Sequence, residues 1–385
     1  MAQLQPKEAS TGRLYYLDNF RTYLTVLVIF HHTAVAYGGI GGWFYRSKFH
    51  PEGSSDVLIS FNVINQSYFM ASFFFLSGLM SSRALKRKSK CEFLRTKYVK
   101  LGIPVIVYTL FGGPAQIALS KLHKHEELSL GILTEFWESL RGICGPVWYP
   151  ALLLIFDTIY ALVPDSASFI APPFLIGIFL DVAGNFGMRL LFPAGDIFVP
   201  LNLKLGYLVQ YITSYLLGIR FAAFDSPSSQ PLLSASPTQI PLPKLTLVTR
   251  TILLASCIIS NVSLIGLLHY YPDRYPRSSV LGGLNLAALS YAFLNETTGY
   301  LLGSAILTVF KYRSLFNRSW GSVGRYSYAA FVVHPIVCVG AQLWTDDWNA
   351  SGVLKTAVIG TIGALGSWAI GWALVRVPKV DMILL

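Results

Sequence analysis

An arginine and a histidine, Arg21 and His32, lie eleven positions apart in one largely apolar stretch, residues 17–37. In a helix eleven residues make close to three turns, so both side chains share one face, about 16 Å apart along the axis. An ionisable pair on an apolar helix is costly unless it faces protein or water, which makes the pair a functional candidate. Because histidine exchanges protons near neutral pH, we predict that His32 acts as a general base.

The neighbours of this pair leave alternatives open. His31 directly precedes His32, and either imidazole could simply hydrogen-bond a neighbouring helix without taking part in chemistry. Asp18 stands three positions before Arg21. We therefore expect Arg21 and Asp18 to orient a site or to hold a charged group of a substrate.

Three carboxylic acids fall inside apolar runs, namely Asp157, Asp181 and Glu296. Glu296 lies near the middle of its run and is the strongest candidate for a catalytic role. The structural alternative is a protonated acid that bonds Asn295 or a tyrosine. The four cysteines are far apart in the sequence, so we predict isolated thiols and no metal site.

Two further features suit ligand binding. Residues 83–100 form the densest basic segment, which could hold phosphate groups or could only fix topology and contact anionic lipid. Trp148 and Tyr149 are expected at a membrane edge, where aromatic side chains anchor helices. Trp148 is also a candidate for lining a substrate tunnel.

The composition indicates what must position these residues. The chain has 385 residues, of which 53% are hydrophobic and only 13% charged, with a mean hydropathy of +0.52. Because a soluble domain carries about a quarter charged residues, we predict an integral membrane protein. The formal net charge of +11 is then expected to set topology, and no nucleic-acid partner is predicted.

The apolar runs predict an all-α, polytopic bundle in one domain, residues 1–385. About ten runs approach the 20 residues that a bilayer needs, at about 18–40, 57–82, 101–120, 145–163, 169–192, 204–224, 246–270, 281–310, 322–344 and 352–375. With both termini in the cytoplasm, roughly two-thirds of the Lys and Arg residues fall on the cytoplasmic side, as expected for membrane proteins. The Pro- and Ser-rich residues 225–244 predict an irregular cytoplasmic loop. The first run is too long for a signal peptide and is expected to stay in the chain.

Five stretches occur in an order that resembles integral-membrane acyltransferase family 3. They are LDNFRTYLTVLVIFHH, SYFMASFFFLSGLM with FLRTKYVKLGIP, GPVWYPALLLIFDTIYAL, GRYSYAAFVVHPIV and VRVPKVDMIL. The resemblance covers about residues 14–380, and the LGIP wording is nearest to the glucan-succinylating branch. Members of the family transfer acyl groups onto sugars, glucans, lipids and natural products.

The resemblance implies roles for particular residues. It selects His32 rather than His31 as the essential histidine, at the family's spacing from Arg21. In place of the family's two arginines, the basic segment offers Arg95, Lys97 and Lys100 as the donor-binding residues. Lysine cannot bind phosphate in the bidentate way that arginine does, so the individual roles of Arg95, Lys97 and Lys100 stay open. A further family pattern is met by Ser327, Tyr328 and His334, and of these Tyr328 and His334 are candidates for substrate contact.

We expect the histidines to share one site. Both His32 and His334 follow the cytoplasmic starts of their predicted spans by similar lengths. They are predicted to line one cavity near the midplane, with Glu296 close by and Arg21 at the cytoplasmic mouth. The alternative is that His334 only bonds a backbone carbonyl.

The predicted function is transfer of an acetyl-like group from acyl-CoA to a hydroxyl of a hydrophobic natural product or a glycan, in the endoplasmic reticulum or plasma membrane. A first alternative keeps the histidine and acid but uses no CoA, and cyclises or isomerises a terpene-like substrate. A second alternative is a transporter or flippase. Transporters often show internal repeats and paired broken helices, and neither is clear in this sequence.

Overall fold

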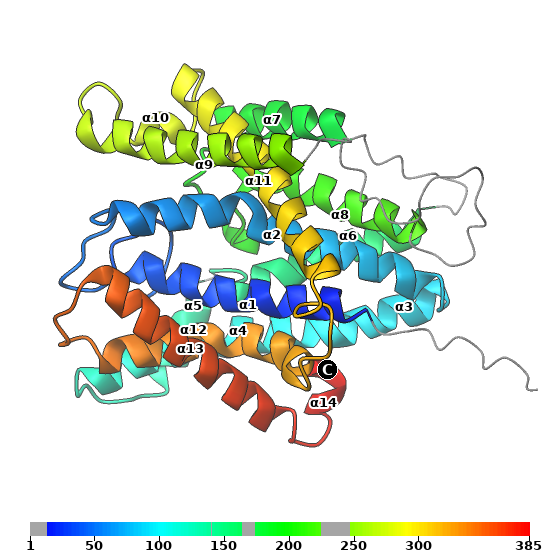
Figure 1. The fold of residues 1–385 in the computed structure, drawn as a ribbon. Coiled ribbons are helices and arrows are strands. Elements are labelled where there is room, and N and C mark those ends of the chain that lie inside the picture. Colours follow the sequence, from blue (N-terminus) through cyan, green and yellow to red (C-terminus); the bar gives the residue numbers. More distant parts are fainter. Residues whose placement is uncertain (1–13, 140, 164–173, 225–246) are drawn as a thin grey trace, which may run out of the picture.

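The computed structural model describes residues 14–139, 141–163, 174–224 and 247–385. Within these ranges every regular element is a helix, apart from one isolated bridge between Phe198 and Leu203. The long helices lie side by side as a bundle (Figure 1). The predicted all-α class is confirmed for this part of the chain. The predicted loop at 225–244 lies outside the described residues.

Each predicted span corresponds to one long helix. These helices are α1 (Tyr15–Ala36), α2 (Asp56–Leu85), α4 (Ile103–His123), α6 (Trp148–Leu162), α7 (Phe174–Leu191), α8 (Leu208–Phe224), α9 (Leu247–Tyr270), α11 (Leu286–Tyr312), α12 (Ser327–Trp344) and α13 (Gly352–Leu374). Shorter helices are α3 (Lys90–Lys97), α5 (Gly131–Glu138), α10 (Ser278–Leu281) and α14 (Val380–Leu384). Short turns of other helix types are η1 (Tyr98–Gly102), η2 (Gly145–Val147), η3 (Val199–Leu201), η4 (Leu205–Tyr207) and η5 (Val323–Tyr326).

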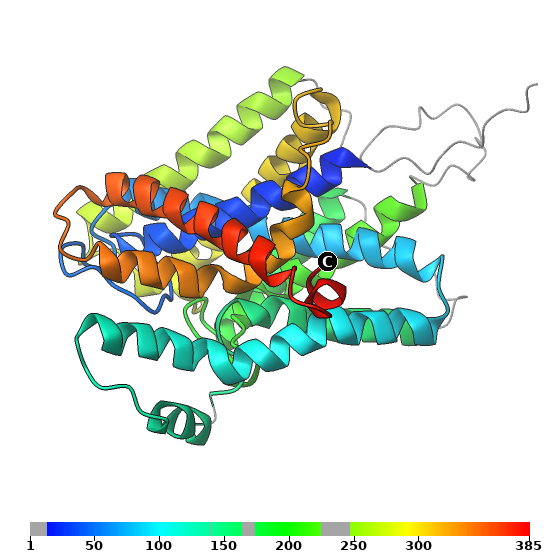
Figure 2. The same cartoon turned by 90° about the horizontal axis from the view of Figure 1, so that it is seen from below.

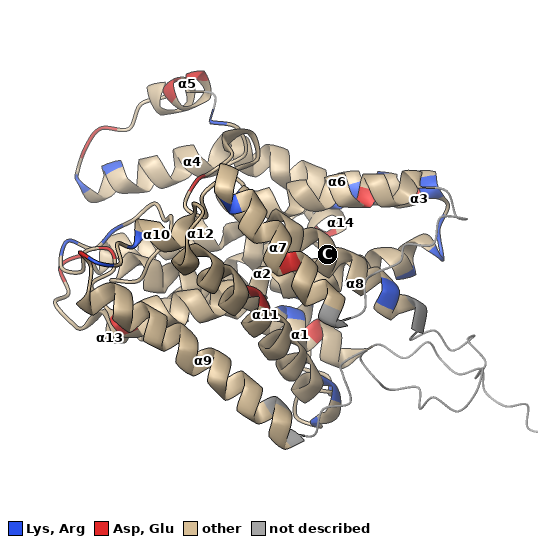
Figure 3. Ribbon diagram, turned by 90° about the horizontal axis from the view of Figure 1, so that it is seen from above, with Lys and Arg blue, Asp and Glu red and all other residues tan. Residues whose placement is uncertain are grey.

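Apolar length supports membrane insertion of the bundle. Among the described residues, six helices are long and apolar enough to cross a bilayer. They are α2, the continuous run of α3, η1 and α4, α6 with η2, most of α9, α12 with η5, and α13. The other long helices, α1, α7, α8 and α11, fall outside this set, so the count of ten spans stays a prediction. Figure 3 shows acidic segments within α7 and α11.

A proline explains why α5 is fixed beside α4, away from the rest of the bundle (Figure 2). Pro114 lies inside α4 and has no N–H, so the carbonyl of Leu110, four residues earlier, loses its helical donor. The indole Nε1–H of Trp137 on α5 donates to that carbonyl at 2.9 Å. One side chain thereby satisfies the carbonyl and attaches the short helix.

Close backbone contact joins α2 and α8 at the centre of the bundle. A Cβ atom built on Gly78 would lie 2.0 Å from the carbonyl oxygen of Tyr215, and one on Gly218 would lie 2.0 Å from that of Phe75. Small residues let membrane helices approach this closely, and much of their association comes from such packing. The main hydrophobic core surrounds this contact and draws residues from α1, α2, α6, α8 and α11.

We predict that Gly78→Ala destabilises the protein, because the added methyl group forces α2 away from α8. Overpacking of this kind costs roughly 1–3 kcal/mol. Gly266→Ala on α9 is the matched control, since a Cβ there meets nothing within 4 Å. Alanine is the better helix former, so the control should be neutral or slightly stabilising. Thermal unfolding of both variants in detergent micelles tests this, and equal melting temperatures would contradict the close contact.

Candidate functional site

Three aromatic rings stack on one another where α1, α12 and the loop after α1 meet. The rings of His32 and His334 lie face to face, with centroids 5.5 Å apart and planes 19° from parallel. Trp43 stacks on His32 with centroids 4.4 Å apart, and its ring is also nearly parallel to that of His334. The structure therefore brings together the two histidines that the sequence singled out, and adds a tryptophan that it did not.

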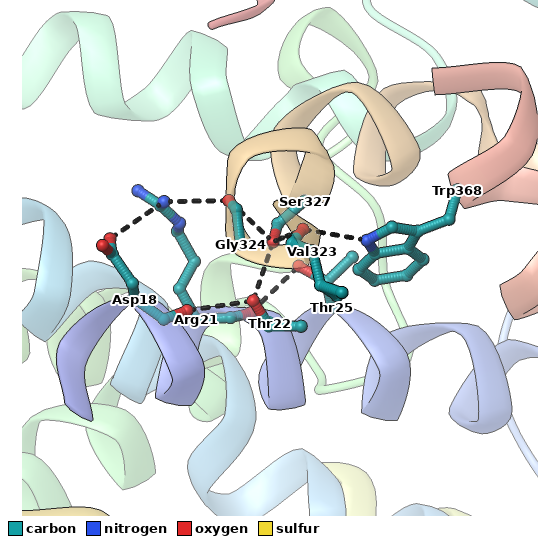
Figure 4. Close-up of polar contacts among 8 residues, drawn as sticks. All are labelled: Asp18, Arg21, Thr22, Thr25, Val323, Gly324, Ser327 and Trp368. Carbon is teal, nitrogen blue, oxygen red and sulfur yellow. Dashed lines mark hydrogen bonds and ion pairs between the residues drawn. The ribbon is translucent and has the colours of Figure 1, made fainter. Parts of the chain in front are cut away.

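Contacts near the start of both helices set the relative position of the histidines (Figure 4). The hydroxyl groups of Thr22 on α1 and Ser327 on α12 share a buried hydrogen bond of 2.9 Å. His32 and His334 follow this contact on α1 and α12, respectively, and their rings stack on each other. The two helices must therefore run in the same direction, which carries both imidazoles to one level of the bundle.

Arg21 belongs to the same junction (Figure 4). Its guanidinium forms an ion pair with Asp18 at 3.2 Å and donates to the carbonyl of Gly324 at 3.3 Å. Its side chain is 40% exposed, so the pair is only partly desolvated. Arg21 and His32 lie on one continuous helix, α1, at the spacing that the sequence predicted.

The loop after α1 holds Trp43 over the histidines. The loop turns back sharply at Gly38, whose φ of +108° suits only glycine. The indole Nε1–H of Trp43 donates to the Oε1 atom of buried Gln342 at 2.8 Å. Further along, Lys48 contacts Asp347 at 2.6 Å, and this hydrogen bond holds the pKa of the Asp347 carboxyl below its usual range. The loop is thus fastened to the end of α12 and to the segment that follows.

Two ring nitrogens of the site are buried and have no hydrogen-bond partner. His334 is fully buried, and its Nδ1 lies 2.6 Å from the carbonyl oxygen of Phe331. Its Nε2 is buried without a hydrogen-bond partner, and so is Nδ1 of His32. A buried polar atom without a partner is costly, so such atoms commonly mark a place that a ligand or water completes. Imidazole nitrogens with open positions are suited to proton transfer.

His31 lies on another side of α1. Its ring packs against Phe69 with centroids 4.9 Å apart and meets His32 edge to face. Asn62 donates to the backbone carbonyl of His31 at 3.0 Å, which ties this turn of α1 to α2. Nδ1 of His31, like Nδ1 of His32, is buried without a hydrogen-bond partner. His31 therefore supports the packing of the site, whereas His32 stacks with the other site residues.

The basic segment holds its candidate residues in different ways. Arg95 is exposed on α3. Lys97 forms an ion pair with Asp157 at 2.8 Å and donates to Ser81 at 2.8 Å, so its charge is already neutralised by a fully buried acid. Lys100 lies in the π-helical turn η1, and its backbone carbonyl accepts a hydrogen bond from the hydroxyl of Tyr328 at 3.1 Å. The three side chains are thus not equivalent candidates for binding a donor.

Glu296 lies in a second buried polar cluster, at the contact of α7 and α11. Its Oε1 is 3.6 Å from Nη2 of Arg189 and accepts from Asn295 at 2.8 Å. The guanidinium of Arg189 lies between the rings of Tyr207 and Tyr291, at 4.7 and 4.9 Å from their centroids. Glu296 and Arg189 are both fully buried. This cluster supplies contacts for Glu296 that the sequence did not predict.

The remaining candidates lie in packed surroundings. Trp148 at the start of α6 packs against Phe74 and Tyr211. An apolar crevice runs between α2, α8 and α11, and Phe75, Leu217 and Leu307 are among its lining residues. No group of three or more metal-binding side chains occurs among the described residues.

Sequence reasoning missed Trp43 and Arg189. Asp181, Asn185 and Arg189 follow each other at intervals of four on α7 and are all fully buried. This polar stripe in an apolar run is visible in the sequence, and its spacing could have pointed to Arg189. No comparable pattern points to Trp43, because its position depends on the turn of a loop.

Comparison with known proteins identifies one family. A family model described as an acyltransferase domain matches residues 14–376, nearly the whole chain. No curated protein matches the sequence.

The stacking predicts that Trp43 shields His32. We expect Trp43→Ala to raise the rate at which diethyl pyrocarbonate modifies His32 several-fold, because one face of the ring loses its cover. Peptide mass spectrometry measures the modification. The control is Trp344→Ala at the end of α12, whose side chain is 86% exposed. An unchanged rate at His32 in the Trp43 variant would contradict the stacking.

Proposed function

This chain belongs to the acyltransferase-3 family, and we propose that it is a membrane-embedded O-acyltransferase. In this proposal it moves an acetyl-like group from acyl-CoA to a hydroxyl of a hydrophobic natural product or a glycan. The observation that supports it most directly is the stacked pair of His32 and His334, whose ring nitrogens include two buried atoms without partners.

The proposed reaction needs one proton transfer in each direction. His32 accepts the proton of the hydroxyl as its oxygen attacks the thioester carbonyl, and the carbon–sulfur bond then breaks. The proton passes from His32 to the leaving thiolate, which gives an ester and a free thiol. While His32 carries the proton it is a cation, and the face of Trp43 at 4.4 Å stabilises such a cation.

The donor would bind at the basic segment. Phosphate groups are held best by charge-assisted hydrogen bonds, and Arg95 is exposed and therefore accessible to them. Lys100 is half-buried beside α12, whereas Lys97 is committed to Asp157. We therefore assign the phosphate contacts to Arg95 and Lys100, and a structural role to Lys97.

The other candidates keep proposed roles that fit their surroundings. Asp18 would orient Arg21, with which it already pairs, near the entrance for the substrates. Trp148 would contact an apolar part of a substrate. Tyr328 already donates its hydroxyl hydrogen to a backbone carbonyl, which leaves its ring and the hydroxyl oxygen, as an acceptor, for a substrate contact. Glu296 is proposed as an acid that supports catalysis from the Arg189 cluster.

The proposed topology has ten spans, with α1, α7, α8 and α11 crossing the bilayer together with the six more apolar helices. An even number of spans places both termini on the same side, and the excess of Lys and Arg on that side makes it the cytoplasmic side of the endoplasmic reticulum or plasma membrane. The basic segment then lies on the side where acyl-CoA is made.

We predict that His32→Ala abolishes acyl transfer while the protein remains folded and inserted, because the proton acceptor is lost. His31→Ala should cost much less, since that ring packs against Phe69. Turnover of the two purified variants, with thermal unfolding as a check on folding, tests the assignment. Full activity in His32→Ala would refute the general-base role.

A second prediction separates donor binding from stability. Replacing Arg95 and Lys100 with glutamine should raise KM for acyl-CoA, because each lost charge-assisted contact is worth roughly 1.5–3 kcal/mol. Lys97→Gln should instead lower the melting temperature, because it leaves buried Asp157 without its cation, a loss that typically costs roughly 3–5 kcal/mol. If the unaltered protein does not bind CoA, the alternative of cyclisation or isomerisation without CoA is favoured.

A further inference from the structure

The dipeptide His334–Pro335 determines which nitrogen of His334 carries the proton. Pro335 lies inside α12 and has no N–H, so the carbonyl of Phe331, four residues earlier, has no helical donor. Nδ1 of His334 lies 2.6 Å from that carbonyl oxygen. A carbonyl oxygen only accepts hydrogen bonds, so Nδ1 must be the nitrogen that donates.

This tautomer leaves a lone pair on Nε2. A neutral imidazole has one donor and one acceptor nitrogen, so with the proton on Nδ1 the Nε2 atom accepts. Nε2 of His334 is buried and has no hydrogen-bond partner, and the whole residue is fully buried. The ring stacks on His32, so this unfilled acceptor belongs to the same site as the proposed base.

A substrate with a single hydroxyl cannot satisfy both histidines. The one hydrogen of a hydroxyl is donated to one acceptor, and in the proposed reaction His32 takes it. The acceptor on His334 then needs a second donor. Because the two ring centroids are 5.5 Å apart, a donor on a neighbouring atom of the substrate is within range.

We propose that Pro335 is a positioning residue that makes His334 a fixed hydrogen-bond acceptor, and that the substrate alcohol carries a second donor beside the reacting hydroxyl. The substrate class is then a vicinal diol or polyol, such as a sugar ring or a dihydroxylated natural product, rather than a simple alcohol. This inference rests on the proposed function for its substrate, but not for the tautomer.

The tautomer is tested by nitrogen-15 NMR of histidine-labelled protein in micelles, with His334→Phe used to assign the signal. We expect the unaltered protein to show His334 protonated at Nδ1 and bare at Nε2. Pro335→Ala restores a backbone N–H that competes for the Phe331 carbonyl, so the signal should shift towards a mixture of tautomers. Pro114→Ala is the matched control, because it restores the same kind of donor at a distant carbonyl, that of Leu110. A proton on Nε2 in the unaltered protein, or no change in Pro335→Ala, would overturn the inference.

The substrate class is tested without turnover, by protection of His334 from diethyl pyrocarbonate. The probes are dodecanol and the matched vicinal diol, dodecane-1,2-diol, added to the unaltered protein. An acceptor left unmet typically weakens binding roughly ten- to a hundred-fold, so the diol should protect at correspondingly lower concentration. The preference for the diol should be weakened in Pro335→Ala and retained in Pro114→Ala, which does not alter the surroundings of His334. Equal protection by both probes, or none, would refute the second donor. Full activity in His32→Ala would refute the general-base role without changing the protection measured in the unaltered protein, so the two proposals fail separately.

Discussion

A backbone carbonyl that loses its helical donor inside a bilayer must find another donor, because lipid offers none. Prolines create two such carbonyls in the helices around the site. The carbonyl four residues before Pro114 is met by the indole of Trp137, and the one before Pro335 by the imidazole of His334. In each case the side chain that satisfies the carbonyl also fixes something else. The two outcomes are an attached helix and an oriented imidazole.

Contacts of Tyr328, Ser327 and His334 make α12 the link between the parts of the proposed enzyme. Tyr328 at its first turn bonds the basic turn η1, and Ser327 beside it bonds α1 next to Arg21. Two turns further along, His334 faces His32. A rigid helix therefore carries the position of the proposed donor site to the proposed site of proton transfer. Ser327, Tyr328 and His334 can make these separate contacts because all three lie on one helix.

The sequence predicted most of the helices and part of the site. Apolar runs of near-membrane length located the long helices, and spacing along a helix selected Arg21 and His32, because both signals are local. The meeting of His32 with His334 followed from an assumed topology and agrees with the structure. The position of Trp43 could not be predicted, because it depends on a glycine turn and on a bond to Gln342 some three hundred residues later. The pairing of Lys97 with Asp157 likewise joins separate helices, and a charge run alone cannot show which cation is already neutralised.

Two buried acids of the bundle are matched by partners on neighbouring helices. Asp157 receives both Lys97 and the hydroxyl of Tyr215, and Asp181 receives the hydroxyls of Thr213 and Tyr300. These acids are costly to bury but are matched by partners from neighbouring helices, which is what a structural role requires. At the histidine site, by contrast, Nδ1 of His32 and Nε2 of His334 are buried and unmatched. Unmatched atoms also occur in the cluster of Arg189 and Glu296 and at His31. What distinguishes His32 and His334 is therefore that their open nitrogens belong to two rings stacked on each other.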